Sequence, residues 1–262
     1  MSSPHISLIP EHIGSILGIS FTNSVLTAWL VTIVLTILAI AATREMRFVP
    51  RGIQNFFEAI IEYVLGLVEQ VMENRDQARK IFPLVATIFL FVLFANLMGI
   101  FPGIGSVGII AEHGEEKFVP LLRPTNADLN MTVALAMISI AAIQILGVVA
   151  LGFLKYSKRF FNFSSPLKLI IGLFELLGEF TKIISFSFRL FGNIFAGEVL
   201  LIVIGFLAPY IIPVPFLILE VFAGFIQAFI FAVLTLVFYK VAITQEAGEE
   251  AVEKDSLENK PA

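Results

Sequence analysis

The chain has 262 residues, of which 58% are hydrophobic and only 15% are charged, whereas soluble domains carry about 25% charged residues. This composition indicates a membrane protein, and a formal net charge of −4 without a basic cluster argues against a nucleic-acid partner. The chain contains no cysteine, which excludes disulfides and thiolate chemistry. The three histidines, His5, His12 and His113, fall outside the apolar stretches, so we interpret them as loop residues and expect no metal site and no cofactor.

The N-terminal part of the chain predicts one membrane anchor. Residues 1–23 are expected to lie outside the membrane, and residues 24–43 form an apolar run of about the 20 residues that a spanning helix needs. No basic residue precedes this run and no cleavage-like sequence ends it, so we expect a retained anchor and no signal peptide. Arg44, Arg47 and Arg51 follow the run, and by the positive-inside rule they place its C-terminal end in the cytoplasm.

Residues 53–78 have the pattern of a different kind of helix. Apolar residues recur at helical spacing along one side, and much of the other side is acidic, with Glu58, Glu62, Glu69 and Glu73. Such a helix is too charged to cross the hydrocarbon core. We predict that it lies along the cytoplasmic surface of the membrane.

Residues 81–154 are predicted to form a helical hairpin. The first limb ends in NLMGIFPG, where Gly and Pro stop a helix, and an outside loop follows at 102–128. The second limb is closed by the basic residues Lys155, Lys158 and Arg159, which indicate a cytoplasmic end.

Residues 166–244 are predicted to form two long helices. The first begins at the Ser165-Pro166 signal and continues for 43 residues, or about 65 Å at about 1.5 Å per residue, while the hydrocarbon core is about 30 Å thick. Because no proline or turn cluster interrupts it, we predict one strongly tilted helix and not two helices with a hidden break. The proline-rich segment 209–215 separates it from the last helix, and residues 245–262 are predicted to be an acidic, disordered cytoplasmic tail.

Together these segments predict an all-α membrane protein with about five hydrophobic helices and one amphipathic interfacial helix. Basic residues gather in the segments assigned to the cytoplasm, and an odd number of crossings fits an N-terminus outside and a C-terminus inside. The sequence shows no internal repeat of the kind found in inverted-repeat transporters.

The first long helix carries a charged residue, Arg189, more than 20 residues from its start. An arginine at the centre of a bilayer costs at least about 3 kcal/mol, so such residues face a partner or a water-filled path. Glu198 lies about 180° from Arg189 and about 13 Å farther along the helix, which predicts two separate aqueous routes, one on each side. At about 100° per residue, an arc of about 80° contains Arg189 and five other polar residues, Lys168, Glu175, Glu179, Lys182 and Asn193.

The cytoplasmic half of this arc has a simpler interpretation. The residues Lys168, Glu175, Glu179 and Lys182 could extend to the cytoplasmic interface and pair with one another. The same interpretation does not fit Arg189, which lies too far from the helix start.

The last helix carries two polar residues, Glu220 and Gln227, seven residues apart and therefore on one face. Glu220 could be a solvated residue at a channel mouth. Gln227 lies deep in the apolar run, where an amide needs a partner. We predict that Arg189 on the neighbouring helix provides it.

Four segments of the chain resemble subunit a of F-type rotary ATP synthases. The strongest is SFRLFGNIFAGE (187–198), and NLMGIFPG (96–103), PTNADLN (124–130) and FIQAFIF (225–231) support it in the expected order. The resemblance covers most of the chain and implies that the two long helices form a tilted hairpin against a ring of c subunits. It also implies a subunit of the bacterial inner membrane, or alternatively of an organelle, with the b subunits of a peripheral stalk and the remainder of the F0F1 ATP synthase as further partners.

The resemblance implies a role for each matching residue. Arg189 would be the arginine that faces the ring and separates two offset half-channels, and Asn193 and Gln227 would line or support that contact. Glu175 would lie in the half-channel open to the cytoplasm. Proton flow through the half-channels would drive ring rotation, with sodium ions as an alternative because the ion is bound mainly on the ring.

The half-channel open to the outside would contain Glu198 and Glu220, with Asp128 and Asn130 near its mouth. Several relatives in the family have a histidine at the position of Glu220 or Glu198, whereas both are glutamates here. A proton path in this chain would therefore use carboxylates and water. Asp128 has a second interpretation, because an aspartate directly before an apolar helix is also an N-cap.

Two other classes of membrane protein fit the sequence less well. An ion antiporter is expected to have broken helices or a repeat pair. A structural anchor for a redox complex needs no intramembrane arginine, and the chain lacks a histidine pair for haem ligation. No phosphate-binding glycine loop is present, so we expect no catalytic activity of its own. Asn96 is interpreted as a residue that forms a helix–helix hydrogen bond.

Overall fold

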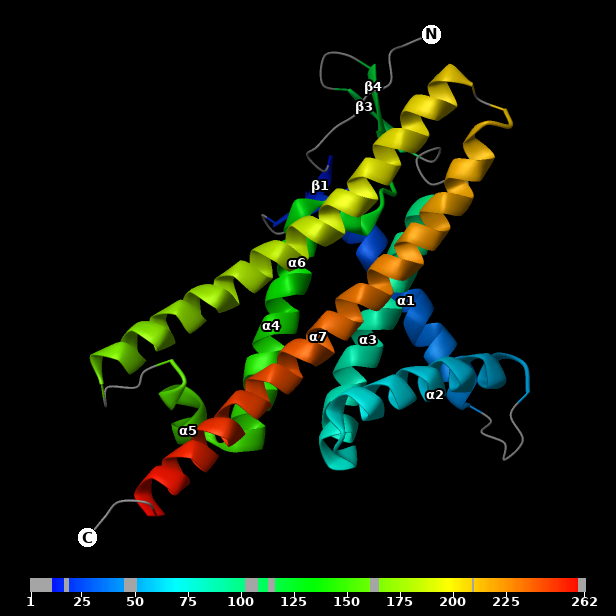
Figure 1. The fold of residues 1–262 in the computed structure, drawn as a ribbon. Helices are drawn as coiled ribbons and strands as arrows, with labels where there is room; N and C mark the ends of the chain where they lie inside the picture. Colours follow the sequence, from blue (N-terminus) through cyan, green and yellow to red (C-terminus); the bar gives the residue numbers. More distant parts are fainter. Residues whose placement is uncertain are drawn as a thin grey trace.

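The computed structural model describes residues 11–16, 19–44, 51–101, 108–112, 116–160, 165–208 and 210–258. Within these ranges the chain is predominantly helical, with two small β-hairpins at one end (Figure 1). Five helices are long and apolar enough to cross a membrane, within Asn23–Thr43, Arg75–Ile100, Leu129–Leu151, Pro166–Leu207 and Pro213–Thr244. The predicted all-α membrane class, with five hydrophobic helices, is confirmed.

Helix α2 (Ile53–Met72) follows α1 (Asn23–Thr43) and lies across the lower ends of α1 and α3 (Figure 1). Val64 and Val68 are buried on one side of α2, whereas Glu62 is exposed, as an amphipathic interfacial helix requires. The helix ends because Glu73 adopts a left-handed conformation with φ of 57°. The sequence prediction extended this helix to residue 78.

Helix α3 (Arg75–Ile100) occupies the centre of the fold. It begins at Arg75, six residues before the predicted start at residue 81. The reason is an N-cap, in which the Asn74 side chain accepts hydrogen bonds from Asp76 N and Gln77 N. It packs against α7 (Pro213–Glu258), α2 and α1. Its buried apolar face supplies a large part of the core, with Ile81, Val85, Ile88, Phe89 and Val92.

Two antiparallel β-hairpins lie where the sequence suggested irregular structure. Strand β1 (His12–Ile16) pairs with β2 (Ile19–Thr22), and β3 (Gly108–Glu112) pairs with β4 (Glu116–Pro120). His12 therefore lies in a strand and not in a loop, while His5 and His113 lie outside the described residues. A short 3-10 turn, η1 (Thr125–Ala127), connects β4 to α4.

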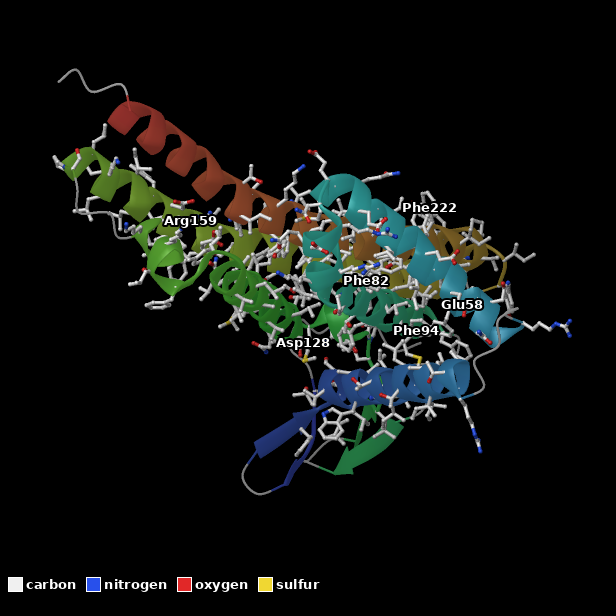
Figure 2. All side chains as sticks on the ribbon, turned by 90° about the horizontal axis from the view of Figure 1, so that it is seen from below. Glu58, Phe82, Phe94, Asp128, Arg159 and Phe222 are labelled. Atoms are coloured by element: carbon white, nitrogen blue, oxygen red, sulfur yellow. The ribbon has the colours of Figure 1, made fainter. Side chains whose placement is uncertain are left out.

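Helix α4 (Leu129–Leu151) is followed by a sharp turn and a short helix, α5 (Phe153–Lys158). The turn is possible because Gly152 adopts a φ of 89°, a conformation that side chains disfavour. Tyr156 then folds back onto α4, where its hydroxyl bonds to Gln144 Oε1. Asp128 and Arg159 lie near opposite ends of α4 (Figure 2).

Helices α6 (Pro166–Leu207) and α7 form a long antiparallel hairpin, visible side by side in Figure 1. Helix α6 is continuous over 42 residues, which confirms the prediction of one helix without a break. Helix α7 continues to Glu258, so the predicted disorder of the tail is wrong over 245–258. That segment is rich in Glu, which favours helix, and it extends an existing helix without a new nucleation cost.

Candidate ion path along the α6–α7 hairpin

An ion pair links α6 to the segment before η1 at the end of the fold that carries the β-hairpins. Arg123 Nη2 lies 3.3 Å from Glu198 Oε2, and the two side chains are only 8% and 20% exposed. The backbone N–H of Arg123 donates to Thr27 Oγ1 on α1 at 3.2 Å. The sequence analysis did not identify Arg123 as a functional residue. Its position directly before PTNADLN, in apolar surroundings, was the signal that could have identified it.

A second glutamate, Glu220 on α7, lies close to this ion pair, and we call Arg123, Glu198 and Glu220 the outer cluster. Glu220 is buried, and its carboxylate lies against Gly197, the residue next to Glu198. A Cβ atom at Gly197 would overlap the carboxylate, so only glycine permits this contact. The structure thus places the Glu220 carboxylate of α7 beside Gly197, the residue that precedes Glu198 on α6.

Asp128 and Asn130 lie at the start of α4. Asp128 is buried and accepts a hydrogen bond from the backbone N–H of Asn130 at 2.9 Å, which confirms the N-cap interpretation. Asn130 is exposed. The role of both residues at a channel mouth stays a prediction.

Buried amides connect three elements beside the hairpin. Asn96 Nδ2 on α3 donates to Gly224 O on α7 at 2.9 Å, and Asn126 Nδ2 in η1 donates to Asn96 Oδ1 at 2.7 Å. The helix–helix hydrogen bond expected for Asn96 is therefore confirmed. Gln227 shares the buried face of α7, with 5% of its surface exposed, and its Nε2 has no hydrogen-bond partner among the described residues.

Arg189 points away from this interior. It is exposed, and its Nη2 lies 3.5 Å from Ser185 Oγ, one turn earlier on α6. The predicted hydrogen bond between Arg189 and Gln227 is wrong, because the guanidinium lies on the outer side of α6 and the amide lies inside the fold. Asn193 is half-buried one turn beyond Arg189.

The surface around Arg189 on α6 carries no other exposed charge. From Leu169 to Leu207, a fully described stretch, Arg189 is the only exposed charged residue. Phe188, the residue before it, is exposed, and so is Leu200 about three turns further along the same face of α6. A charge on such a face needs a partner outside this chain.

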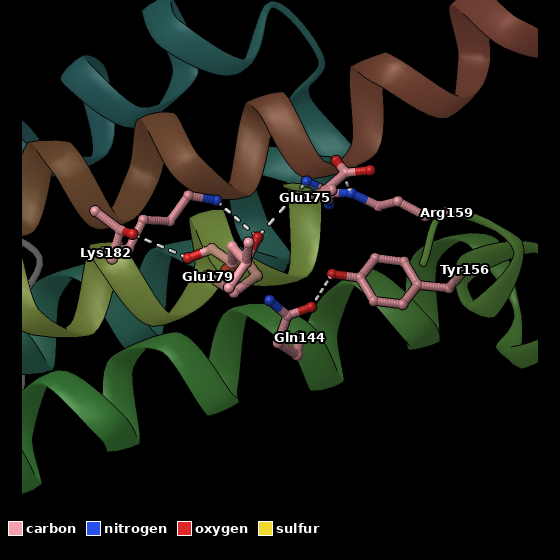
Figure 3. Close-up of polar contacts among 8 residues, drawn as sticks. Gln144, Tyr156, Arg159, Glu175, Glu179 and Lys182 are labelled. Atoms are coloured by element: carbon pink, nitrogen blue, oxygen red, sulfur yellow. Dashed lines mark hydrogen bonds and ion pairs between the residues drawn. The ribbon is translucent and has the colours of Figure 1, made fainter. Parts of the chain in front are cut away.

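An inner cluster lies at the other end of α6 (Figure 3). Arg159 Nε bonds to Glu175 Oε1, and Arg159 Nη2 lies 3.6 Å from Glu179 Oε1. Lys182 Nζ lies 2.7 Å from Glu179 Oε1 and 4.8 Å from the centre of the Phe238 ring on α7. The alternative pairing of Glu179 with Lys182 is therefore confirmed.

Arg159 is the residue that sequence reasoning missed in the inner cluster. Its position in a basic stretch after α4 indicated only a cytoplasmic boundary. Its side chain is 5% exposed, which shows that it belongs to the interior contact between α5 and α6. Lys168 is exposed and lies near the start of α6.

One long apolar helix, α6, has a buried charged cluster near each end and an exposed arginine between them. These features define a multi-pass membrane protein built around a charged helical hairpin. The family model described as ATP synthase A chain matches residues 25–240. The chain therefore belongs to the ATP synthase A chain family, which confirms the resemblance seen in the sequence.

Several bacterial relatives are similar over most of their length. The ATP synthase subunit a of Campylobacter jejuni strain 81-176 is 40% identical over 222 residues, covering 84% of this chain and 89% of the relative. The protein of the same name from Moorella thermoacetica is 33% identical over 216 residues, covering 82% and 88%. That of Geotalea uraniireducens is 32% identical over 223 residues, covering 85% and 88%.

Proposed function

We propose that this chain is the proton-conducting stator subunit of a bacterial F-type ATP synthase. It provides two offset aqueous half-channels to the carboxylates of a ring of c subunits, and Arg189 keeps the half-channels apart. The observation that carries the proposal is the exposure of Arg189 on an otherwise uncharged face of α6, between buried charged clusters toward either end.

The chemistry of Arg189 follows from its fixed charge. At about 4 Å and an effective dielectric constant of about 20, a guanidinium favours the charged form of a ring carboxylate by about 4 kcal/mol. This corresponds to about a thousandfold weaker proton binding by that carboxylate. The same charge repels protons and so insulates one half-channel from the other. Lysine is a poor substitute because it can lose its proton when desolvated.

The two clusters suit the two half-channels. Glu198 and Glu220 lie at the end of the fold with the β-hairpins, which we assign to the outside, with Asp128 and Asn130 near the mouth. Glu175 lies at the end with α2 and α5, which we assign to the cytoplasm because basic residues gather there. Asn193, half-buried one turn beyond Arg189, lines the ring contact, and Gln227 supports it from the buried face of α7.

The chain is then one subunit of a larger membrane complex. The c ring covers the exposed face of α6, and the b subunits of the peripheral stalk hold the chain against rotation. Nucleotide chemistry belongs to the remainder of the F0F1 complex, so this subunit is not itself catalytic. The orientation has the N-terminus outside and the C-terminal end in the cytoplasm.

The test compares Arg189→Ala with wild type in inverted membrane vesicles at equal abundance of the complex. ATP-driven acidification of the vesicles is expected to disappear while ATP hydrolysis by the soluble sector persists. Arg75→Ala is the matched control, because Arg75 is an exposed arginine outside the hairpin whose side chain pairs with Glu69. Unchanged pumping in Arg189→Ala would refute the proposal.

A further inference from the structure

Helix α5 and the start of α6 carry an exposed surface that the ion path does not use. Phe153 and Leu154 on α5 are 71% and 78% exposed. Lys158 on α5 and Lys168 on α6 are exposed as well. We propose that these four residues, the α5–α6 surface, bind the anionic phospholipid headgroups of the leaflet at the end of the fold that carries α2 and α5. This binding depends on the membrane-spanning helices and is independent of the proton path.

The position of α5 at the edge of the membrane follows from its neighbours in the chain. Helix α4 is long and apolar enough to cross a membrane and ends at Leu151, and α6 begins at Pro166. Gly152, with its φ of 89°, turns the chain away from the direction of α4 directly after the crossing. The segment that follows therefore lies at the membrane surface, where apolar and charged side chains meet the lipid together.

One side of α5 is fixed to the rest of the protein. The Tyr156 hydroxyl bonds to Gln144 Oε1 on α4, and Arg159 Nε bonds to Glu175 Oε1 on α6. Tyr156 and Arg159 are three residues apart, so they lie on the same side of this short helix. Contacts to two long helices thus determine which side of α5 is turned outward.

The outward side of α5 continues onto α6. Leu154 and Lys158 are four residues apart and lie next to each other on this side. Lys168 lies one turn before Gly172, which is in contact with the backbone carbonyl of Phe160. Lys168 is therefore on the side of α6 that meets the end of the α5 segment, and the two lysines flank one exposed apolar surface.

The charge of this surface is uniformly positive. No Asp or Glu occurs between residues 151 and 174. Neither Lys158 nor Lys168 has an ion pair among the described residues. A lysine near an anionic membrane surface adds to the attraction, and its long stem lets the ammonium stay among the headgroups while neighbouring apolar side chains enter the acyl boundary. The α5–α6 surface provides both kinds of side chain.

A protein partner fits this surface less well than lipid. The cores of protein–protein interfaces are depleted in lysine, because its charge and its flexible stem are costly to bury. Apolar side chains flanked by lysines are instead typical of segments that lie in the membrane interface. The composition of the α5–α6 surface therefore favours a lipid occupant.

The test uses the whole ATP synthase in vesicles of phosphatidylcholine alone or with about 30% phosphatidylglycerol, an anionic lipid. Because this chain has no cysteine, label on its band after electrophoresis reports only an introduced cysteine. Leu154→Cys is treated with a water-soluble maleimide that does not cross the membrane, in vesicles whose soluble sector faces outward. Labelling is expected to be several-fold slower in the vesicles that contain phosphatidylglycerol.

Three further variants identify the cause of the slower labelling. Lys158→Gln with Lys168→Gln is expected to remove the difference between the two lipid compositions. Arg79→Gln with Lys80→Gln removes the same charge from exposed residues of α3 near the same end of the fold, and is expected to keep the difference. Glu62→Cys, at an exposed position of α2, measures how far the anionic surface slows thiol labelling in general.

Equal slowing of Leu154→Cys and Glu62→Cys would reveal only this general effect and would overturn the proposal. Slowing that persists without Lys158 and Lys168 would overturn it too. Labelling of Leu154→Cys that is much slower than that of Glu62→Cys in both lipid compositions would show that a protein covers the surface, and the lipid assignment would be wrong.

A second position protects the test against loss of assembly. Phe153→Cys replaces Leu154→Cys if that variant does not assemble, because Phe153 is almost as exposed. The labelling rate requires no proton pumping. Its outcome is therefore separate from that of Arg189→Ala, whose unchanged pumping would refute the proposed function.

Discussion

Gly197 on α6 and Glu220 on α7 are in direct contact, because the glycine lacks the Cβ atom that would occupy the position of the carboxylate. The contact brings an ionisable group of one long helix to the backbone of the other. It also places that group next to Glu198, whose own partner, Arg123, comes from a third part of the chain. A glycine in the FGNIFAGE segment thus determines where a carboxylate of α7 can lie.

Gly197→Ala is expected to displace Glu220 and to lower ATP-driven pumping several-fold. The added Cβ would overlap Glu220 Oε2, at the end of a flexible side chain, so the glutamate has to move, while helix propensity improves by about 1 kcal/mol. Gly205→Ala gains the same propensity on the same helix, but a Cβ atom there meets nothing within 4 Å. Acidification of inverted vesicles compares the two variants, and equal pumping by both would contradict the role of the contact.

Asn96→Ala is expected to destabilise the packing of α3 on α7 by about 1–2 kcal/mol. The substitution leaves Gly224 O and Asn126 Nδ2 without the partners that they have at 2.9 and 2.7 Å. Ser139→Ala is the control, because Ser139 is equally buried but bonds only to Leu135 O within its own helix. Thermal denaturation of the detergent-solubilised complex measures the difference, and equal melting temperatures would argue against the inter-helix bond.

The helices were predictable because their signals are local. Length and hydropathy locate the spanning segments, and the lack of an interrupting proline in 167–207 predicted that α6 is continuous. The N-cap at Asp128 was also visible in the sequence as an alternative. The two β-hairpins were not, since their pairing depends on how short polar and apolar segments meet in three dimensions.

The site was only partly predictable, because side-chain partners depend on how helices are rotated against one another. The helical wheel correctly separated Arg189 from Glu198, but it could not show that Gln227 lies inside the fold. Arg123 and Arg159 lie outside the long helices; the segment PTNADLN after Arg123 was a local signal for that residue, whereas nothing local distinguishes Arg159 from a boundary charge. Their burial results from the approach of α6, which is a tertiary feature.

The surface ion pair between Glu73 and Lys240 predicts a small pH dependence of stability. Lys240 Nζ lies 2.7 Å from Glu73 Oε1 and holds the pKa of Glu73 below its usual value through a hydrogen bond and its charge. A carboxyl group whose pKa is lowered by folding stabilises the fold above its unfolded pKa of about 4.3 and loses this effect as the pH falls through the folded pKa.

Glu73→Gln is therefore expected to lower the melting temperature slightly at pH 7. The difference from wild type should shrink below about pH 4, where the carboxyl group becomes protonated. Glu62→Gln is the control, because Glu62 is exposed on the same helix and has no ion pair among the described residues. A difference that stays constant across this pH range would show that the effect is not electrostatic.

Arg159→Ala is expected to be the most destabilising single substitution in the inner cluster, by about 3 kcal/mol or more. It removes the positive charge that faces both Glu175 and Glu179, whose side chains are only 21% and 11% exposed. Loss of one partner leaves buried carboxylates with less compensation than they have in the native fold. Glu179 keeps Lys182 at 2.7 Å, so the loss at Glu175 should dominate.

Lys158→Ala removes the same charge from the neighbouring residue, which is exposed, and is expected to have little effect. The comparison is made by thermal denaturation of the solubilised complex and by the abundance of the subunit in the membrane. Adding Glu175→Gln to Arg159→Ala should recover part of the loss, because it removes the uncompensated charge. A double variant no more stable than Arg159→Ala would show that packing of the arginine, and not its charge, holds α5 against α6.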